Sequence, residues 1–300
     1  MNIIESTKKA KVLIEALDYI QRFKNSTFVI KYGGAFMDDP DPEKKESVAR
    51  DIAFLASVGI KVVVVHGGGK AISRAMAQAG LVAEFKNGMR VTDRETVAIV
   101  EDTLNNKVNA EICDMIKSFG VNAKSIKGNT VLKCEKLYSK DEEGNDIDLG
   151  FVGQTSQVDK QIIIDAIADG SVAVVSPIAL GEKDYLPYNT NADVAASAVA
   201  ASLKSRRLVF LCDVAGLMYD KDDASTLIPT LLIDEVQGLK DKKIIQGGML
   251  PKVDSGVKAL KEGVKRVHFI DGYMPHSMLL EIFTNKGVGT EIIHEEKQRR

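Results

Sequence analysis

Two spacing patterns of apolar residues run along the chain and predict its helices and strands. Apolar residues three or four positions apart predict an amphipathic helix at Ser6–Phe23, whereas the β-branched run Ile60–Val65 predicts a strand buried on both faces. The same patterns predict these further elements, in chain order: strand Thr27–Lys31, helix Glu43–Ser57, a helix from the Gly67 run to Ala79, one long helix Thr92–Phe119, weak strand Val121–Lys127, helix Gln161–Ala168, strand Ser171–Ile178, helix Asp193–Leu203, strand Arg207–Cys212, helix Lys252–Glu262 and a last strand Arg266–Ile270.

Two polar segments interrupt this order. The segment Asn129–Val158 contains the acidic turn 141–146 between extended arms, which predicts a β-hairpin insertion. The polar stretch Gly181–Asn189 predicts a boundary between two lobes. Because strands otherwise alternate with helices, we expect an α/β fold with a mainly parallel sheet covered on both faces.

Composition narrows the class of protein. The 300 residues carry 40 basic and 42 acidic side chains, a formal net charge of -2, which gives no reason to expect nucleic acid or an anionic membrane as a partner. The segment Met1–Leu13 lacks the apolar stretch of a signal peptide. Three scattered cysteines indicate a reducing compartment, so we expect a cytoplasmic protein, and the four histidines lack metal-ligand spacing.

Glycine clusters follow two of the predicted strands and are the strongest sign of a ligand site. One cluster is Lys31-Tyr32-Gly33-Gly34 and the other is His66-Gly67-Gly68-Gly69. Glycines at the carboxyl ends of parallel strands let backbone N–H groups approach an anion, although tight turns without a ligand are the alternative. Neither cluster fits the Walker A or the Rossmann fingerprint, which disfavours P-loop enzymes and dehydrogenases.

Three later segments carry further candidate residues. Arg90, between Gly88 and a helix start capped by Thr92 or Asp93, could grip a carboxylate through two hydrogen bonds or could be a solvated surface residue. The run Asn189–Asp193 precedes an alanine-rich helix, which it could simply cap. Lys252 opens a helix against the helix dipole, which suggests an anion nearby, although it could equally be a solvated side chain.

Taken in order, these segments resemble the amino-acid kinase family, and within it the arginine-sensitive acetylglutamate kinases. The resemblance covers nearly the whole chain, and aspartate kinases differ because they typically have Gly-Gly-Thr-Ser where this chain has Gly33-Gly34-Ala35-Phe36. The matching stretches are Val29–Gly34, Val64–Gly69, Asn87–Thr92, Asn189–Asp193 and Gly247–Lys252. The resemblance implies a three-layer α/β/α sandwich in two lobes, with the acceptor bound in residues 26–186 and ATP with Mg²⁺ in residues 187–300.

The resemblance also implies roles for individual residues. Lys31 and Lys252 would stabilise the transition state, Asp193 would orient both lysines, and Gly33 and Gly34 would bind the transferring phosphoryl group. The remaining implied contacts are with the acceptor at Gly68, Gly69, Arg90 and Asn189, and with the nucleotide at Asp213 and Gly216. No protein side chain is expected to bind a metal.

The implied reaction is ATP-dependent phosphorylation of the side-chain carboxylate of N-acetyl-L-glutamate, an early step of arginine biosynthesis. That carboxylate is already ionised at neutral pH and needs no general base, which fits the lack of an evident catalytic histidine or acid pair. Two alternatives stay open: a kinase for a related carboxylate such as N-acetyl-aminoadipate, and a non-catalytic arginine or nitrogen sensor. The presence of both Lys31 and Lys252 argues against the sensor.

Residues 1–25 form a predicted arm ahead of the first strand. The arm could dock on its own core or pair between subunits. Its resemblance to arginine-inhibited relatives implies a hexamer, built as a trimer of dimers, that is inhibited by L-arginine. The segment Lys286–Glu291 resembles the arginine-binding end of those enzymes.

Overall fold

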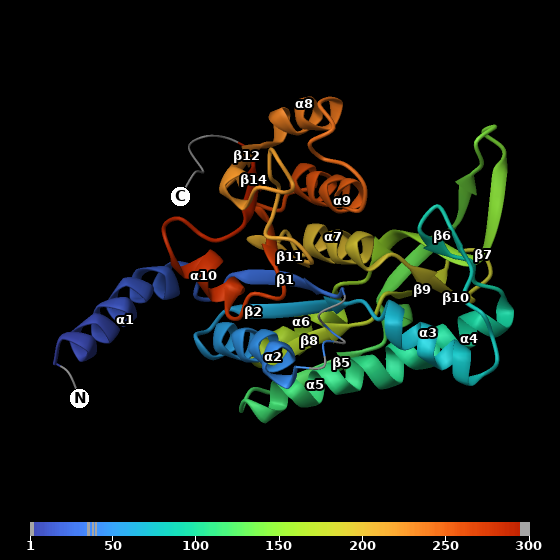
Figure 1. Ribbon diagram of the computed structural model, residues 1–300. Coiled ribbons are helices and arrows are strands. Elements are labelled where there is room, and N and C mark those ends of the chain that lie inside the picture. Colours follow the sequence, from blue (N-terminus) through green and yellow to red (C-terminus); the bar gives the residue numbers. More distant parts are fainter. Residues whose placement is uncertain (1–2, 35–36, 38, 40, 295–300) are drawn as a thin grey trace.

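The computed structural model describes residues 3–34, 37, 39 and 41–294. Ala35 and Phe36, where this chain differs from the aspartate kinase pattern, lie outside the described residues. So do residues 1–2 of the predicted arm and residues 295–300 of the predicted C-terminal lobe. In the described part of the chain, one eight-stranded sheet forms the centre, in the order β12-β14-β13-β11-β1-β2-β8-β5 (Figure 1). Its strands are β1 (Thr27–Tyr32), β2 (Lys61–His66), β5 (Ala123–Ile126), β8 (Val172–Val175), β11 (Arg207–Cys212), β12 (Thr230–Leu232), β13 (Val267–Asp271) and β14 (Thr290–Ile293).

Neighbouring strands of this sheet run parallel except for β13 and β14, so the predicted mainly parallel sheet is confirmed. Strands β1 and β2 are buried on both faces along almost their whole length, as their apolar runs predict. In their register Lys31 pairs with Val65, and Tyr32 pairs with His66. The two glycine clusters therefore leave the sheet side by side at the same edge.

Helices pack on both faces of the sheet and complete the predicted sandwich (Figure 1). Two separate apolar clusters, one on each face, make up the core. One face carries α6 (Gln161–Ala168), α7 (Ala192–Ser202), α8 (Val236–Asp241) and α9 (Met249–Lys261). The other carries α2 (Pro42–Ser57), α3 (Gly69–Gln78), α4 (Arg94–Asp102), α5 (Asn109–Ser118) and α10 (Ser277–Phe283).

The predicted hairpin is present but is more than an insertion. Strands β6 (Leu132–Lys140) and β7 (Asp146–Val158) form the antiparallel pair around the expected turn. They close a small barrel with β9 (Ile178–Gly181) and β10 (Pro187–Thr190), in the order β10-β7-β6-β9. The polar stretch at 181–189 is therefore mostly the turn and second strand of the β9–β10 hairpin, whose alternation was too short to recognise.

The prediction that Arg266–Ile270 is the last strand was wrong. Strand β13 is not the last strand, because β14 follows it and pairs with it antiparallel. The short elements β12, α8 and α10 were not predicted. The expected single helix 92–119 is continuous from α4 through α5, but a π-helical turn, η2 (Thr103–Val108), joins the two parts. Short 3-10 turns complete the order at η3 (Gly128–Thr130), η4 (Ala224–Thr226) and η5 (Ile233–Glu235).

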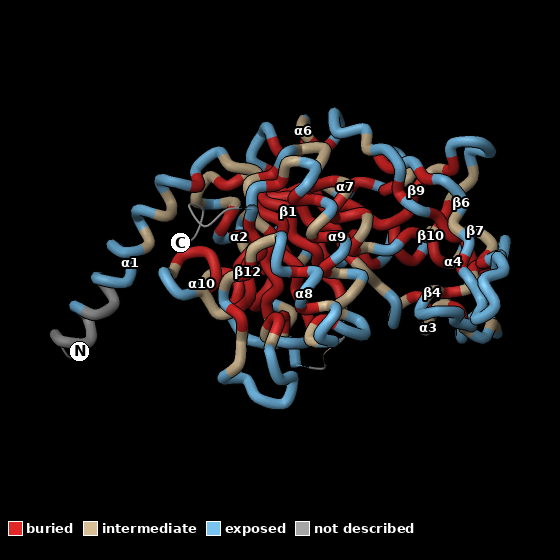
Figure 2. Tube along the Cα trace, turned by 90° about the horizontal axis from the view of Figure 1, so that it is seen from above, coloured by how far each residue is buried: buried red, intermediate tan, exposed pale blue. Residues whose placement is uncertain are grey.

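The N-terminal helix α1 (Ile3–Phe23) docks at its C-terminal end and projects beyond the rest of the chain at its N-terminal end (Figure 2). The ring of Phe23 is buried, 5.5 Å from that of Phe28 and 6.3 Å from that of Phe283. Farther from the core, Val12, Leu13, Ile14 and Leu17 are exposed. Among the described helices, α1 included, none has the length and apolar character needed to cross a membrane.

Candidate active site

Asp193 holds two lysines that come from distant parts of the sequence. Lys31 is the last residue but one of β1, and its Nζ lies 3.1 Å from Oδ1 of Asp193. Lys252, from the first turns of α9, places its Nζ 2.8 Å from Oδ2 of the same carboxylate. Asp193 itself stands in the first turn of α7, where the side chain of Asn191 caps the helix by accepting a hydrogen bond from the Asp193 N–H. The three residues predicted to be catalytic therefore form one cluster.

The cluster is largely withdrawn from solvent, with 7% of the Lys31, 9% of the Asp193 and 22% of the Lys252 side chain exposed. Burial alone would raise the pKa of the Asp193 carboxyl, but the ammonium groups of Lys31 and Lys252 outweigh it and hold that pKa below its usual range. Burial would lower the pKa of Lys252, whereas the Asp193 carboxylate raises it. The cluster sets two lysines against one carboxylate, an excess of basic over acidic groups that suits an anionic ligand.

The two glycine clusters touch beside these charges. The Gly67 N–H donates to the carbonyl of Tyr32 at 2.7 Å. A Cβ on Gly33 would meet the Gly67 nitrogen at 3.1 Å and the Lys31 Nζ at 3.1 Å, so a side chain there would push the two loops apart. Gly34 has a φ of 126°, a conformation that favours glycine. Backbone N–H groups can therefore approach a ligand from both loops.

Arg90 is held by a two-stranded hairpin, β3 (Phe85–Lys86) and β4 (Met89–Arg90), and not by the open loop expected from the sequence. Its turn is Asn87-Gly88, where both residues have positive φ, as such hairpins require. Nη2 of Arg90 donates to the carbonyl of Gly69 at 3.1 Å and to Oγ of Ser73 at 2.9 Å.

The guanidinium of Arg90 is buried and lies 4.7 Å from the ring of Phe85. Burial lowers the pKa of Arg90. Within the described part of the chain, no carboxylate pairs with it. A buried cation without a counter-ion is a ready site for an anionic ligand group.

One cavity of about 310 Å³ joins the predicted residues. This volume is typical of small-molecule sites. Its walls are mixed polar and apolar. Among the predicted residues, it is lined by Lys31, Gly34, Gly68, Gly69, Arg90, Asn189 and Asp193. Lys252 is connected to this cavity through its ion pair with Asp193, and Gly33 directly precedes the lining residue Gly34.

The two predicted nucleotide residues lie outside this cavity. Asp213 is exposed directly after β11, the strand beside β1. Gly216 is buried, and a Cβ there would meet Oγ1 of Thr290 at 2.6 Å. That hydroxyl accepts a hydrogen bond from the Leu217 N–H at 2.9 Å, so Gly216 has a packing reason to be glycine. Its role toward a nucleotide stays a prediction.

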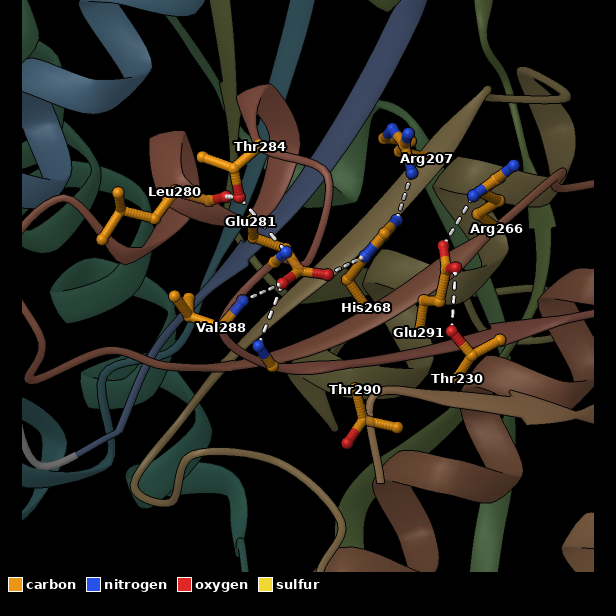
Figure 3. A network of polar contacts seen from close by, with 12 residues as sticks. Arg207, Thr230, Arg266, His268, Leu280, Glu281, Thr284, Val288, Thr290 and Glu291 are labelled. Carbon is orange, nitrogen blue, oxygen red and sulfur yellow. Dashed lines mark hydrogen bonds and ion pairs between the residues drawn. The ribbon is translucent and has the colours of Figure 1, made fainter. Parts of the chain in front are cut away.

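A second polar network lies under α10, away from the cavity (Figure 3). Glu281 is buried and accepts hydrogen bonds from the Val288 and Gly289 N–H groups at 2.8 and 2.9 Å. It also pairs with Nδ1 of His268 at 2.7 Å, and Nε2 of His268 lies 2.5 Å from Arg207. This network fixes the loop within the segment 286–291 against the core.

Several residues of the site were not identified from the sequence. Ser73, Phe85 and Leu104 line or support the cavity but belong to no motif on their own. The Asn87-Gly88 pair did carry a hairpin signal that would have placed Phe85 beside Arg90. Across residues 3–34, 37, 39 and 41–294, no three histidine, cysteine or acidic side chains gather as a metal site would require.

Comparison with known proteins agrees with this geometry. The model of the amino acid kinase family matches residues 26–271. The acetylglutamate kinase of Akkermansia muciniphila is 44% identical over 290 residues, 97% of each chain. That of Archaeoglobus fulgidus is 45% identical, over 95% of this chain and 99% of its own.

Solved structures share the fold. The N-acetylglutamate synthase of Neisseria gonorrhoeae, in complex with coenzyme A and N-acetyl-glutamate, superposes with a TM-score of 0.80 at 25% identity. The match covers 95% of this chain and 63% of the synthase. A carbamate kinase from Giardia lamblia matches with a TM-score of 0.66 at 15% identity, over 90% of this chain and 99% of its own. The full-length matches to curated relatives, together with the family model, show that this chain belongs to the amino acid kinase family.

Proposed function

We propose that this chain transfers the γ-phosphoryl group of ATP to the side-chain carboxylate of N-acetyl-L-glutamate, forming N-acetyl-L-glutamyl 5-phosphate. The observation that carries the proposal is the pairing of Lys31 and Lys252 on one buried carboxylate, beside a cavity that also holds Arg90. The names of the relatives from Akkermansia muciniphila and Archaeoglobus fulgidus support this acceptor.

The chemistry required is the approach of two anions. A carboxylate oxygen of the acceptor attacks the γ-phosphorus, the bond from that phosphorus to the β–γ bridging oxygen breaks, and ADP leaves. No proton needs to be removed, because the carboxylate is ionised at neutral pH. The barrier falls when fixed positive charges and N–H groups face the equatorial phosphoryl oxygens. Lys31, Lys252 and the N–H groups of Gly33 and Gly34 are suited to that role, with Asp193 orienting the lysines.

The acceptor has anionic groups at both ends, and the cavity offers a partner for each. Arg90 would grip the α-carboxylate, while the reacting carboxylate would lie near Lys31. Gly68 and Gly69 would contribute N–H groups to the acceptor, and Asn189 would bind its carboxylate or amide region. The acetyl group keeps the amine from attacking the acyl phosphate product.

We assign ATP to the C-terminal side of the molecule, residues 187–300, and the acceptor to residues 26–186. ATP would lie over the carboxyl ends of β11 and β13, near Asp213 and Gly216, since ligands of open α/β sheets bind at those ends. Mg²⁺ would arrive with ATP and would offset negative charge on its phosphates. A cytoplasmic enzyme fits this substrate and the three free, buried cysteines.

A coupled ADP-release assay with Mg-ATP tests the proposal, with acyl phosphate trapped as the hydroxamate. We expect turnover with N-acetyl-L-glutamate and at least tenfold lower kcat/KM with N-acetyl-L-2-aminoadipate, since one methylene is worth about 10–200-fold. A preference for the longer acid would assign the chain to the alternative kinase activity. Arginine binding without turnover of either acid would favour the sensor.

We further propose that the enzyme is inhibited by L-arginine as a hexamer joined through α1. A cavity of about 350 Å³ lies between α1 and α10, lined by the acidic side chains of Glu15 and Asp18 and by the basic side chains of Arg22, Arg207 and Arg266. The two carboxylates suit the guanidinium of an arginine ligand, and the arginine side chains suit its carboxylate. Glu281 and the network of Figure 3 hold the loop next to this region in place. The exposed apolar face of α1 could pair with the same helix of another subunit.

A further inference from the structure

The long helix that follows Arg90 is widened by one π-helical turn where it passes the acceptor cavity. In η2 the N–H of Asn109 donates to the carbonyl of Leu104, five residues back. Such turns are rare and are frequent at functional sites. A purely α-helical path would rotate every residue after the turn by about 100° relative to those before it. The wide turn therefore decides which side chains of this helix face the cavity.

Polar side chains fix the wide turn to the sheet. Asn105 is buried, and its Oδ1 accepts a hydrogen bond from the hydroxyl of Ser176, just after β8. The same hydroxyl oxygen accepts from the Gly128 N–H at 2.8 Å, just after β5. One turn later, Nδ2 of Asn109 donates to the carbonyl of Val174 at 3.0 Å. The turn is thus anchored to two strand ends and cannot slide along the cavity wall.

This anchoring presses Leu104 against Gly68. Leu104 is buried and lines the acceptor cavity. A Cβ built on Gly68 would lie only 2.6 Å from Cδ2 of Leu104, closer than real contacts allow. Leu104 therefore leaves no room for a side chain on Gly68. The contact with Leu104 is one physical reason for glycine at this position.

We propose that Leu104 is a specificity-determining residue that limits the length of the acceptor. With its two carboxylates held near Arg90 and Lys31, an acceptor one methylene longer has to bend sideways. Leu104 lines the same cavity as Lys31 and Arg90 and packs against Gly68, so its side chain takes up space that a longer acceptor would need. The inference rests on the proposed function, because it concerns the acceptor of that reaction.

The test compares Leu104→Ala with Val108→Ala. Val108 is buried on the same wide turn and also faces Gly68, but it lines a separate small cavity of about 60 Å³ and not the acceptor cavity. The quantity measured is the kcat/KM for N-acetyl-L-2-aminoadipate divided by that for N-acetyl-L-glutamate. We expect Leu104→Ala to raise this ratio about tenfold, the discrimination of one methylene, and Val108→Ala to leave it unchanged.

An unchanged ratio in folded Leu104→Ala protein, or an equal rise in Val108→Ala, would overturn the inference. Wild-type protein that turns over neither acid would instead overturn the proposed function.

A second measurement does not depend on activity. Gly68→Ala should lower the Tm of the wild-type protein clearly, but should lower it much less in a Leu104→Ala background, because the clash is then gone. Additive Tm changes would show that Leu104 does not impose glycine at position 68, since residues in contact are the ones expected to deviate from additivity.

Discussion

Oγ of Ser73 lies 2.9 Å from Nη2 of Arg90 and at the same time donates to the carbonyl of Gly69 at 3.0 Å. The hydroxyl thus ties the guanidinium to the glycine turn that opens α3. Ser73 does not need to touch the acceptor to matter, because it fixes the direction in which Arg90 presents its remaining N–H groups.

Replacing Ser73 with alanine should therefore weaken acceptor binding without slowing the chemical step. A hydrogen bond to a charged group is worth roughly 1.5–3 kcal/mol, so we expect the KM for N-acetyl-L-glutamate to rise about tenfold or more. Both kcat and the KM for ATP should stay near wild type, and Ser73→Thr, which keeps the hydroxyl, should restore the acceptor KM. A fall in kcat alone would contradict a positioning role. Steady-state kinetics with each substrate varied in turn measure all three constants.

Lys252→Ala should act on kcat. If the ammonium faces charge that develops only in the transition state, its loss should lower kcat about 10²–10³-fold with small changes in either KM. Lys258→Ala is the matched control, because Lys258 lies on the same helix with 58% of its side chain exposed. Equal kcat values for the two variants would show that Lys252 does not stabilise the transition state.

Lys31 and Lys252 differ in how much of their placement the sequence could predict. The glycine clusters and Lys31 could be placed because they end strands whose apolar runs are visible in the sequence. The meeting of Lys252 with Asp193, 59 residues apart, depends on how α7 and α9 pack, which no local pattern encodes. Family resemblance supplied that pairing in advance, and the geometry now gives its physical reason.

Short or irregular elements were the ones missed. Strands β9, β10 and β14 each have four residues, too few for alternation to stand out. The π-helical turn left no trace in the spacing of apolar residues, because its anchors, Asn105 and Ser176, are polar and lie 71 positions apart. The role inferred for Leu104 could only come from the structure.

Asp193→Asn should shift the alkaline limb of the pH–rate profile. In the wild type the Asp193 carboxylate raises the pKa of Lys252 in spite of its burial. Asparagine keeps the shape but removes the charge that opposes the effect of burial, so the pKa of Lys252 should fall. We expect the loss of kcat at high pH to begin at a lower pH, on top of a lower plateau. The measurement is kcat from pH 6 to 10 in both proteins. A variant whose kcat is lower throughout, but whose alkaline limb falls at the same pH as that of the wild type, would contradict this account.

Two buried histidines should make the fold sensitive to acid. Burial lowers the pKa of His66 to about 4, and burial together with the nearby Arg207 lowers that of His268 to about 4, against an ordinary value near 6.5 in the unfolded chain. Between pH 6.5 and 4 the unfolded chain binds more protons, so the free energy of unfolding falls as pH falls through this window.

For His66 alone the expected loss is about 3 kcal/mol by pH 4. Urea unfolding at half-unit pH steps should show it, and His66→Gln should reduce the slope. A slope that is the same in both proteins would mean that His66 is not buried as a neutral imidazole.

The role of α1 in assembly can be separated from its role in the core. Deleting residues 1–25 should yield dimers and raise the arginine concentration needed for inhibition, but it also removes the buried ring of Phe23. The paired substitution Leu13→Glu and Leu17→Glu is sharper. Both side chains are exposed, 73% and 47%, so the subunit should keep its Tm while charge repulsion separates the helices. Light scattering should then report dimers with full activity and weaker arginine inhibition. Hexamers that persist in this variant would show that assembly uses a different surface.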